Sequence, residues 1–227
     1  KKITYSELLN KTSSLAASLY NIGVKKGDRV ILYMPMIPEV IISMLACARI
    51  GAVHSVVFGG FAAEELASRI SDVLPKVIIS ASCGLEPKRI IDYKEILDKA
   101  LSLTSHKPLK QVIYQREQHF CKLSLENDIS WNEFVDTSTS INCMPVDSNE
   151  PLYILHTSGT TGIPKGIVRT NGGHAVALLN SMKMTYDISE DDVFWAASDV
   201  GWVVGHSYIV YAPLLLGCST VLYEGKP

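Results

Sequence analysis

The sequence lacks the features that mark several classes of protein. Its five cysteines are odd in number and widely spaced, with no C-x-x-C pair, so neither a disulfide framework nor a zinc site is predicted. No uninterrupted apolar run reaches the roughly 18 residues that span a bilayer, and the start has no signal-peptide pattern. We expect buried, reduced thiols at all five positions, which are Cys47, Cys83, Cys121, Cys143 and Cys218.

An excess of charge of either sign is also missing. The chain has 21 Lys and Arg residues against 23 Asp and Glu residues, a formal net charge of -2. That balance gives no support for a nucleic acid or an anionic membrane surface as the main partner. With 47% hydrophobic and 19% charged residues among 227, the composition suits a globular protein of one large domain or two small ones.

Neither end of the sequence reads as a natural terminus. The first residues open directly into a helix signal, and the chain stops at "TVLYEGKP", just after an apolar run. We therefore expect a piece of a longer protein, for which the missing targeting signal says little about location.

Short apolar runs that predict strands alternate with segments that predict helices. Helices are predicted over residues 4–22, 38–52, 62–74, 89–103, 172–185 and 205–216, the first opened by a capping box of Thr4 and Glu7. Strands are predicted over 28–35, 52–58, 76–80, 111–114, 152–156, 192–197 and 219–223. This alternation predicts an α/β fold with a mainly parallel sheet flanked by helices, and the weakly patterned stretch 115–150 reads as a surface excursion.

The stretch "HTSGTTGIPKG", residues 156 to 166, is too polar for a core. It follows a predicted strand, and ligands of open α/β sheets bind beyond the carboxyl ends of strands. Its glycines let backbone N–H groups approach a ligand, while its hydroxyls and Lys165 add donors and a charge, which together suit a polyphosphate. The spacing is not that of the common P-loop. Taken alone, the stretch is also compatible with a flexible connector to the predicted helix that follows.

The order of these residues resembles the signature loop of the adenylate-forming enzymes. The core T-S-G-[ST]-T-G-x-P-K-G is matched at every position. In that family the loop holds the β- and γ-phosphates of ATP, and the resemblance implies a catalytic role for Lys165. The phosphate-binding positions that it implies are Thr157, Ser158, Gly159, Thr160, Thr161 and Gly162.

The segment "DVGWVVGHSY", residues 199 to 208, resembles the acetyl-CoA synthetase branch of that family. The resemblance implies that Trp202 and Val203 border the acyl pocket and that Val204, in place of the branch's threonine, lies near the coenzyme thiol. By residue type alone, Val203, Val204, Ile209 and Val210 read as buried positions of an amphipathic segment. His206 reads as a hydrogen-bonded structural histidine more readily than as a catalyst.

Residues 31–70 are similar to the same branch, including Gly59 and Gly60, which there approach coenzyme A. A tight turn would use the same glycines equally well. Downstream, the arginine-rich coenzyme-binding stretch of the branch is replaced by Leu85-Glu86-Pro87-Lys88-Arg89. The resemblance still assigns coenzyme contacts to Glu86, Pro87, Lys88 and Arg89, whereas by residue type alone they read as a solvated helix start.

The resemblance covers the whole chain and implies part of the large N-terminal domain of an adenylate-forming enzyme. The implied organisation is a first α/β subdomain over 1–150 and the start of a second over 151–227. The implied reaction converts a short-chain carboxylate, such as acetate or propionate, through acyl-AMP to acyl-CoA, with ATP, Mg²⁺ and coenzyme A. No protein metal ligand is predicted, and the family's remaining motifs lie downstream, so the 227 residues alone are expected to be inactive.

Other interpretations stay open. An adenylation domain of the peptide-synthetase type would share the loop of residues 156–166, and a non-catalytic nucleotide-binding protein would share the fold. The sequence resembles mitochondrial short-chain acyl-CoA synthetases. This resemblance suggests a location in the mitochondrial matrix, with the cytoplasm as the alternative.

Overall fold

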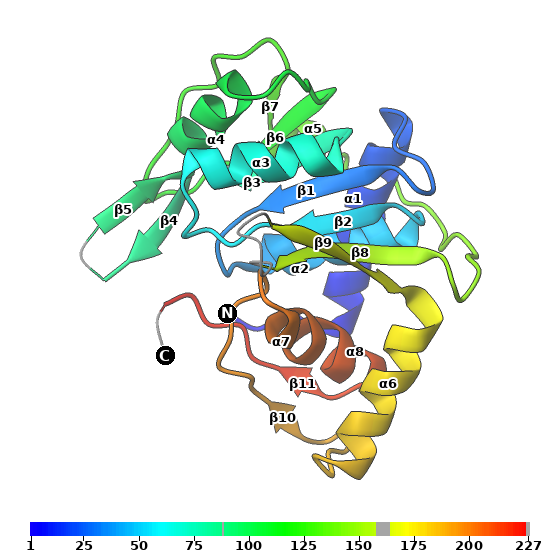
Figure 1. The fold of residues 1–227 in the computed structure, drawn as a ribbon. Coiled ribbons are helices and arrows are strands. Elements are labelled where there is room, and N and C mark those ends of the chain that lie inside the picture. Colours follow the sequence, from blue (N-terminus) through cyan, green and yellow to red (C-terminus); the bar gives the residue numbers. More distant parts are fainter. Residues whose placement is uncertain (88, 158–163, 226–227) are drawn as a thin grey trace.

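A computed structural model describes residues 1–87, 89–157 and 164–225 (Figure 1). Its centre is a seven-stranded sheet in the order β7-β6-β3-β1-β2-β8-β9. Adjacent strands are parallel except β8 and β9, which pair antiparallel. The strands are β1 (Arg29–Tyr33), β2 (Val53–Val56), β3 (Val77–Ala81), β6 (Lys110–Tyr114), β7 (Asp128–Ser130), β8 (Pro151–Thr157) and β9 (Lys165–Thr170). The predicted α/β class with a mainly parallel sheet is confirmed.

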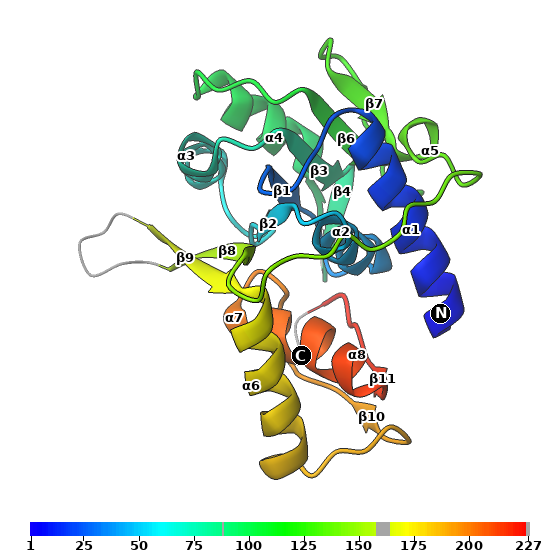
Figure 2. The same ribbon diagram turned by 90° about the vertical axis from the view of Figure 1, so that its right-hand side faces the viewer.

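Helices cover both faces of this sheet (Figure 2). Helices α1 and α2 pack together against one face, and α3 and α4 pack together against the other. The helical segments are α1 (Tyr5–Asn21), α2 (Pro38–Arg49), α3 (Ala63–Val73), α4 (Tyr93–Ser102), α5 (Trp131–Phe134), α6 (Asn171–Met184), α7 (Val203–Gly205), a π-helix (His206–Tyr211) and α8 (Ala212–Leu216).

Strand β1 contributes side chains to both hydrophobic cores, one on each face of the sheet. Side chains alternate along a strand, so Val30 and Leu32 enter the core with α1 and α2, while Ile31 and Tyr33 enter the core with α3 and α4. All four are fully buried, which is why this strand reads as a continuous apolar run in the sequence.

The predicted helix over 89–103 begins too early. Strand β5 (Arg89–Asp92) pairs antiparallel with β4 (Cys83–Glu86), and only then does α4 start. Asp92 is the N-cap, because its Oδ1 accepts a hydrogen bond from Glu95 N at 2.9 Å. The stretch 83–92 is therefore a β-hairpin, which protrudes beside the sheet in Figure 1.

Two further expectations need correction. The stretch 115–150 is more than a surface excursion, because β7 joins the sheet beside β6 and Ser130 caps α5. All five cysteines are free, but only Cys47, Cys83 and Cys218 are buried; Cys121 is partly buried and Cys143 is exposed.

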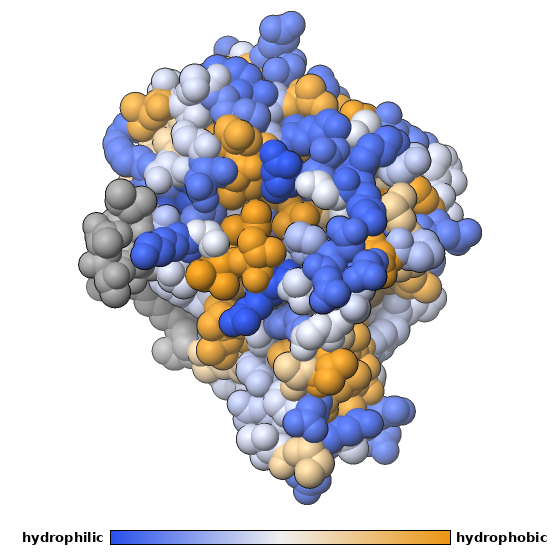
Figure 3. Space-filling view, turned by 45° about the vertical axis from the view of Figure 1, so that its right-hand side comes forward, coloured by the Kyte–Doolittle hydropathy of each residue, from blue (hydrophilic) through white to orange (hydrophobic). Residues whose placement is uncertain are grey.

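The last part of the chain is less regular than predicted. Strands β10 (Val193–Phe194) and β11 (Ser219–Thr220) form a short parallel pair, and the predicted helix over 205–216 contains the π-helical turn. Apolar side chains remain exposed on β9 and α6, among them Val168 and Val176. An apolar area also occupies the middle of the face in Figure 3. Among the helices of the described residues, none is long and apolar enough to cross a membrane.

Candidate functional site

The carboxyl ends of four parallel strands meet at one edge of the sheet. β1, β2, β3 and β8 run in the same direction, so the loops after them leave from the same side. The hairpin of β4 and β5 and the C-terminal segment also lie on that side, at the left of Figure 1. This is the edge at which open α/β sheets bind ligands.

A cavity of about 110 Å³ opens at this edge. Loops after β1 and β2, the β4–β5 hairpin and two later segments enclose it. Its lining residues are Pro35, Met36, Phe58, Gly59, Gly60, Leu85, Glu86, Pro87, Ile91, Tyr93, Asp199, Glu224 and Gly225. The walls are mainly apolar, with a few polar groups from distant parts of the sequence, as is common in ligand sites.

Four residues predicted to contact coenzyme A meet in this cavity. Gly59 and Gly60 come from the loop after β2, and Glu86 and Pro87 come from the tip of the hairpin. Arg89 is exposed and lies opposite Glu86 in the β4–β5 register, with its Nε 2.9 Å from Glu86 Oε2. The solvated helix start was therefore a wrong interpretation of this stretch, which forms the end of a hairpin.

Tyr93 is a cavity residue that the sequence analysis missed. Its buried ring stacks on Tyr33, with centroids 4.7 Å apart. A Cβ placed on Gly59 would lie 1.8 Å from the Tyr93 hydroxyl oxygen, and one on Gly84 would lie 2.6 Å from the ring. Both glycines therefore leave the space that this ring fills. No signal in the sequence separates Tyr93 from the other apolar positions of a helix start.

Asp199 brings a carboxylate to the same cavity. Its Oδ1 accepts a hydrogen bond from Gly201 N at 2.7 Å, which closes a tight turn. Burial raises the pKa of Asp199 above its ordinary value. A Cβ on Gly201 would lie 2.9 Å from the backbone of Phe58, so the turn packs directly on the loop after β2. The sequence motif includes Asp199 but does not show which residues surround it in the cavity.

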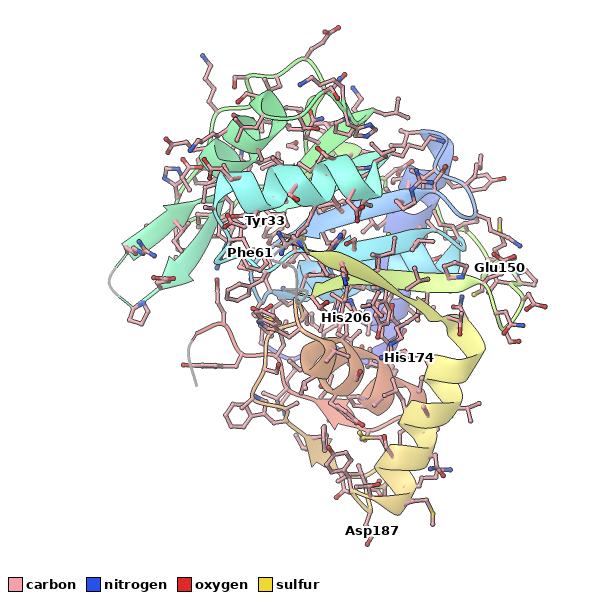
Figure 4. The ribbon with its side chains drawn as sticks, in the orientation of Figure 1. Tyr33, Phe61, Glu150, His174, Asp187 and His206 are labelled. Atoms are coloured by element: carbon pink, nitrogen blue, oxygen red, sulfur yellow. The ribbon has the colours of Figure 1, made fainter. Side chains whose placement is uncertain are left out.

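Trp202 lies just outside the cavity, against its wall. The Trp202 ring is 5.6 Å from that of Phe58 and 6.4 Å from that of Phe61, centroid to centroid. Phe61 and Tyr33 lie together at the carboxyl edge in Figure 4. Trp202, Val203 and Val204 are 46%, 51% and 48% exposed and do not line the cavity. The prediction of burial is wrong for Val203 and Val204 and is confirmed for Ile209 and Val210.

His206 is hydrogen bonded, as the sequence analysis predicts. Its Nδ1–H donates to Val200 O, and its ring stacks on His54 with centroids 5.2 Å apart. Burial lowers the pKa of His206 to about 3, so the imidazole is neutral at pH 7. His54 Nε2 lies 2.6 Å from the Tyr211 hydroxyl, and His174 approaches from α6 (Figure 4). Tyr153 of β8 lies 4.6 Å from the His206 ring, centroid to centroid, so these rings pack the π-helix against β8.

The predicted phosphate loop joins β8 to β9. Thr157 ends β8 and pairs in register with Lys165, which begins β9. Ser158, Gly159, Thr160, Thr161 and Gly162 lie outside the described residues, as does Lys88 of the hairpin. The prediction that this loop leads directly into a helix is wrong, because β9 intervenes before α6.

The loop end of this β8–β9 hairpin is fixed to helix α3. His156, the residue before Thr157, places Nε2 2.8 Å from Asp72 Oδ2. A Cβ on Gly166 would lie 3.4 Å from each of these two atoms. Lys165 is exposed, and neither it nor Thr157 lines the cavity. The His156–Asp72 pair had no signal in the sequence, since its two members are far apart in the chain.

Among the described residues, no group of three or more His, Cys, Asp and Glu side chains is placed to hold a metal ion. The carboxylates of the cavity are partly committed to guanidinium groups, Glu86 to Arg89 and Glu224 to Arg116. Asp199 has no cationic partner in the part of the chain that the structure describes.

Comparison with known proteins places this geometry in context. A family model described as "AMP-binding enzyme" matches residues 1–227. The human protein named acyl-CoA synthetase short-chain family member 3, mitochondrial, is 54% identical over 225 residues, which are 99% of this chain and 33% of that protein. The acetyl-coenzyme A synthetase of Pasteurella multocida is 44% identical over 226 residues, 99% of this chain and 34% of that protein.

A solved structure has the same fold over the full chain. The acetoacetyl-CoA synthetase from Streptomyces lividans superposes with a TM-score of 0.90 at 27% identity, covering 100% of this chain and 34% of that one. The chain thus spans about a third of the length of each of these relatives.

Proposed function

The chain belongs to the family of AMP-binding enzymes, and on that premise we propose that its whole protein activates a short-chain carboxylate. The reaction joins acetate or propionate to ATP as acyl-AMP with release of pyrophosphate, and then transfers the acyl group to coenzyme A with release of AMP. The relatives named as acyl-CoA and acetyl-CoA synthetases support this reaction class.

One observation supports the coenzyme half most directly. Gly59, Gly60, Glu86 and Pro87, which the resemblance assigns to coenzyme A, come from two separate loops and meet in one cavity. Phe58 lines that cavity and also contacts Trp202, the residue assigned to the acyl pocket. A thiol entering along the cavity would therefore arrive beside the acyl group.

The first half-reaction needs charge neutralisation more than proton transfer. A carboxylate is already an anion at neutral pH, so no general base is required for its attack on the α-phosphorus. The positioned cation of Lys165 and the hydroxyl of Thr157 would oppose the charge of the transferred phosphates. Mg²⁺ would supply further positive charge.

In the second half-reaction the thiol displaces AMP from the acyl carbon. The C–S bond forms as the acyl–oxygen bond to AMP breaks, and the thiol proton leaves with solvent or phosphate. Trp202, backed by Phe58 and Phe61, would form a wall of the acyl pocket with Val203, and Val204 would lie toward the thiol.

Pyrophosphate exchange by the full-length protein tests the proposal. We expect pyrophosphate exchange that depends on acetate or propionate and little exchange with amino acids. Dependence on amino acids would instead indicate an adenylation domain of the peptide-synthetase type. Binding of ATP with no exchange for any carboxylate would indicate a non-catalytic nucleotide-binding protein.

Three finer points are also proposals. The 227 residues alone form no thioester, because the relatives are about three times longer; thioester formation by this chain from acetate or propionate would contradict that. The first subdomain covers 1–150 and the second starts at 151, although β8 and β9 complete one sheet with the earlier strands. The mitochondrial matrix is the proposed location, supported by the human relative's name, with the cytoplasm as the alternative; cell fractionation decides between them.

A further inference from the structure

Two polar groups of the cavity lack the partners that the others have. Glu86 and Glu224 each pair with a guanidinium group. Within the described residues, the Tyr93 hydroxyl makes no hydrogen bond. Asp199 accepts one, from a backbone N–H, and faces no cation in the part of the chain that the structure describes. Tyr93 is buried and Asp199 is partly buried. Polar groups withdrawn from water normally find partners, so the open hydrogen-bonding positions of these two side chains point to a ligand.

The two groups line the same cavity. Tyr93 comes from the start of α4 and Asp199 from the turn before Trp202, and both line the same space of about 110 Å³. The pKa of the Tyr93 phenol is raised first by burial, then by Tyr33 and by the carboxylate of Asp199. One of the groups is a hydrogen-bond donor, and the other, when ionised, is an acceptor.

Apart from the two ion-paired glutamates, Glu86 and Glu224, and three glycines, the rest of the cavity is apolar. Met36, Phe58, Leu85 and Ile91 line it together with two prolines. A cavity needs only about 10–15 Å³ to hold a water molecule, so this one has room for several heavy atoms of a chain. The expected occupant is therefore an aliphatic arm that carries a group with one donor and one acceptor. A secondary amide has that chemistry.

We propose that Tyr93 and Asp199 select the thiol substrate by binding an amide of its arm. The Tyr93 hydroxyl donates to the amide carbonyl, and the Asp199 carboxylate accepts from the amide N–H. This inference rests on the proposed function, since coenzyme A is a thiol whose arm carries amides, and it adds two residues that the motif comparison did not supply.

Tyr93→Phe and Asp199→Asn test the pair in the full-length protein. Tyr93→Phe keeps the stack on Tyr33 and removes only the hydroxyl. Asp199→Asn keeps an oxygen for Gly201 N and removes the charge. Tyr208→Phe is the matched control, because its hydroxyl bonds Ser181 outside the cavity. Thermal melting checks that each variant is folded.

The measurement is the rate of thioester formation from preformed acyl-adenylate, with coenzyme A and with ethanethiol, which has no amide. Both variants are expected to lower kcat/KM for coenzyme A about tenfold, the scale of one lost hydrogen bond. They should change the rate with ethanethiol and the pyrophosphate exchange less than twofold. Tyr208→Phe should resemble the wild type throughout.

Two results would overturn the inference while leaving the proposed function intact. One is an unchanged kcat/KM for coenzyme A in both variants. The other is an equal loss with ethanethiol, which would mean a general structural role. If the wild type shows no carboxylate-dependent exchange, the proposed function fails. Calorimetric binding of coenzyme A to wild type and Tyr93→Phe then decides the inference by itself, with equal affinities contradicting it.

Discussion

Arg116 and Glu224 form a bidentate ion pair although 108 residues separate them in the chain. Nη1 lies 2.7 Å from Oε1 and Nη2 lies 2.7 Å from Oε2, and Nη1 also donates to Cys83 O at 3.0 Å. The side chains are 8% and 21% exposed. Because Glu224 lines the cavity, this pair ties the C-terminal segment to the strand that begins the hairpin.

Breaking this pair should be costly. Glu224→Gln leaves the buried Arg116 charge without its counter-ion, and we expect the free energy of unfolding to fall by about 3 kcal/mol. The exposed pair of Lys99 and Glu64 is the matched control, and Glu64→Gln should have no measurable effect. Urea unfolding of both variants makes the comparison. Equal stabilities would mean that the Arg116 pair contributes little.

Gly205 is expected to tolerate no side chain. A Cβ there would lie 2.0 Å from Asp199 O and 2.7 Å from Val200 N, which are backbone atoms that cannot move alone. Gly205→Ala should therefore destabilise the protein by at least about 3 kcal/mol and displace the turn that carries Asp199. Gly173→Ala is the control within α6, where the nearest atom is at 3.4 Å. It should stabilise by about 0.5–1 kcal/mol. Thermal melting distinguishes the two outcomes.

The buried histidines should make the protein sensitive to acid. Burial lowers the pKa of His206 to about 3 and that of His174 to about 4, and it holds His54 well below its ordinary value. The unfolded histidines titrate near 6.5 and so bind more protons than the folded ones below that pH. Stability is therefore full above pH 6.5 and falls as the pH drops toward 4.

His206→Phe tests this pH dependence. One histidine with a strongly lowered pKa removes about 2 kcal/mol of stability between pH 6.5 and pH 5. The variant loses the hydrogen bond to Val200 O and should be less stable at pH 7, but its stability should fall less on acidification. Urea unfolding at the two pH values gives both quantities. A loss equal to that of the wild type would contradict the assignment.

Lys165 should matter for adenylation and not for folding. A unit charge 4 Å from a phosphate charge contributes roughly 4 kcal/mol at an effective dielectric of 20, and solvent around this exposed residue reduces that value. We expect Lys165→Ala to lower pyrophosphate exchange about a hundredfold, with an unchanged circular dichroism spectrum. Lys165→Arg should retain part of the activity. Full activity of Lys165→Ala would show that Lys165 takes no part in adenylation.

Because Glu86 and Arg89 form an ion pair, we expect the affinity for coenzyme A to depend on the salt concentration. If Arg89 binds a phosphate of coenzyme A, as the resemblance implies, Glu86 would compete with that phosphate for the guanidinium group. Glu86→Gln should then tighten coenzyme binding several-fold at low ionic strength. Salt screens exposed charges, and the difference from wild type should shrink as the salt concentration rises. Titration with coenzyme A at two salt concentrations measures this. A weaker affinity for the variant would show that Glu86 itself contributes to binding.

Local signals account for the parts of the fold that the sequence predicted well. The capping box of Thr4 and Glu7 marks the start of α1 with hydrogen bonds of 2.7 and 3.2 Å. The buried strands of the sheet are continuous apolar runs because both of their faces are covered. Segments whose structure depends on contacts with residues far away in the sequence were not predicted. The ends of β4 and β5 are joined by the pairing of Glu86 with Arg89, and the π-helical turn has no period of its own that a sequence reveals.

Some residues of the site were likewise predicted from local motifs, and others were found only in the structure. Gly59, Gly60 and Trp202 stand in motifs that can be read along the chain. Tyr93 and Glu224 become cavity residues only because the topology brings α4 and the C-terminal segment to the edge where β1 and β2 end. Their roles depend on contacts between residues far apart in sequence, which no local pattern encodes.

The ring of Tyr93, set between Gly59 and Gly84, has a consequence for how this surface can change over evolutionary time. None of the three positions is independent, since any side chain larger than hydrogen at either glycine would push the aromatic group and the β4–β5 hairpin outward together. Homologues that carry a bulkier residue at one of these glycines should therefore carry a smaller one in place of the tyrosine.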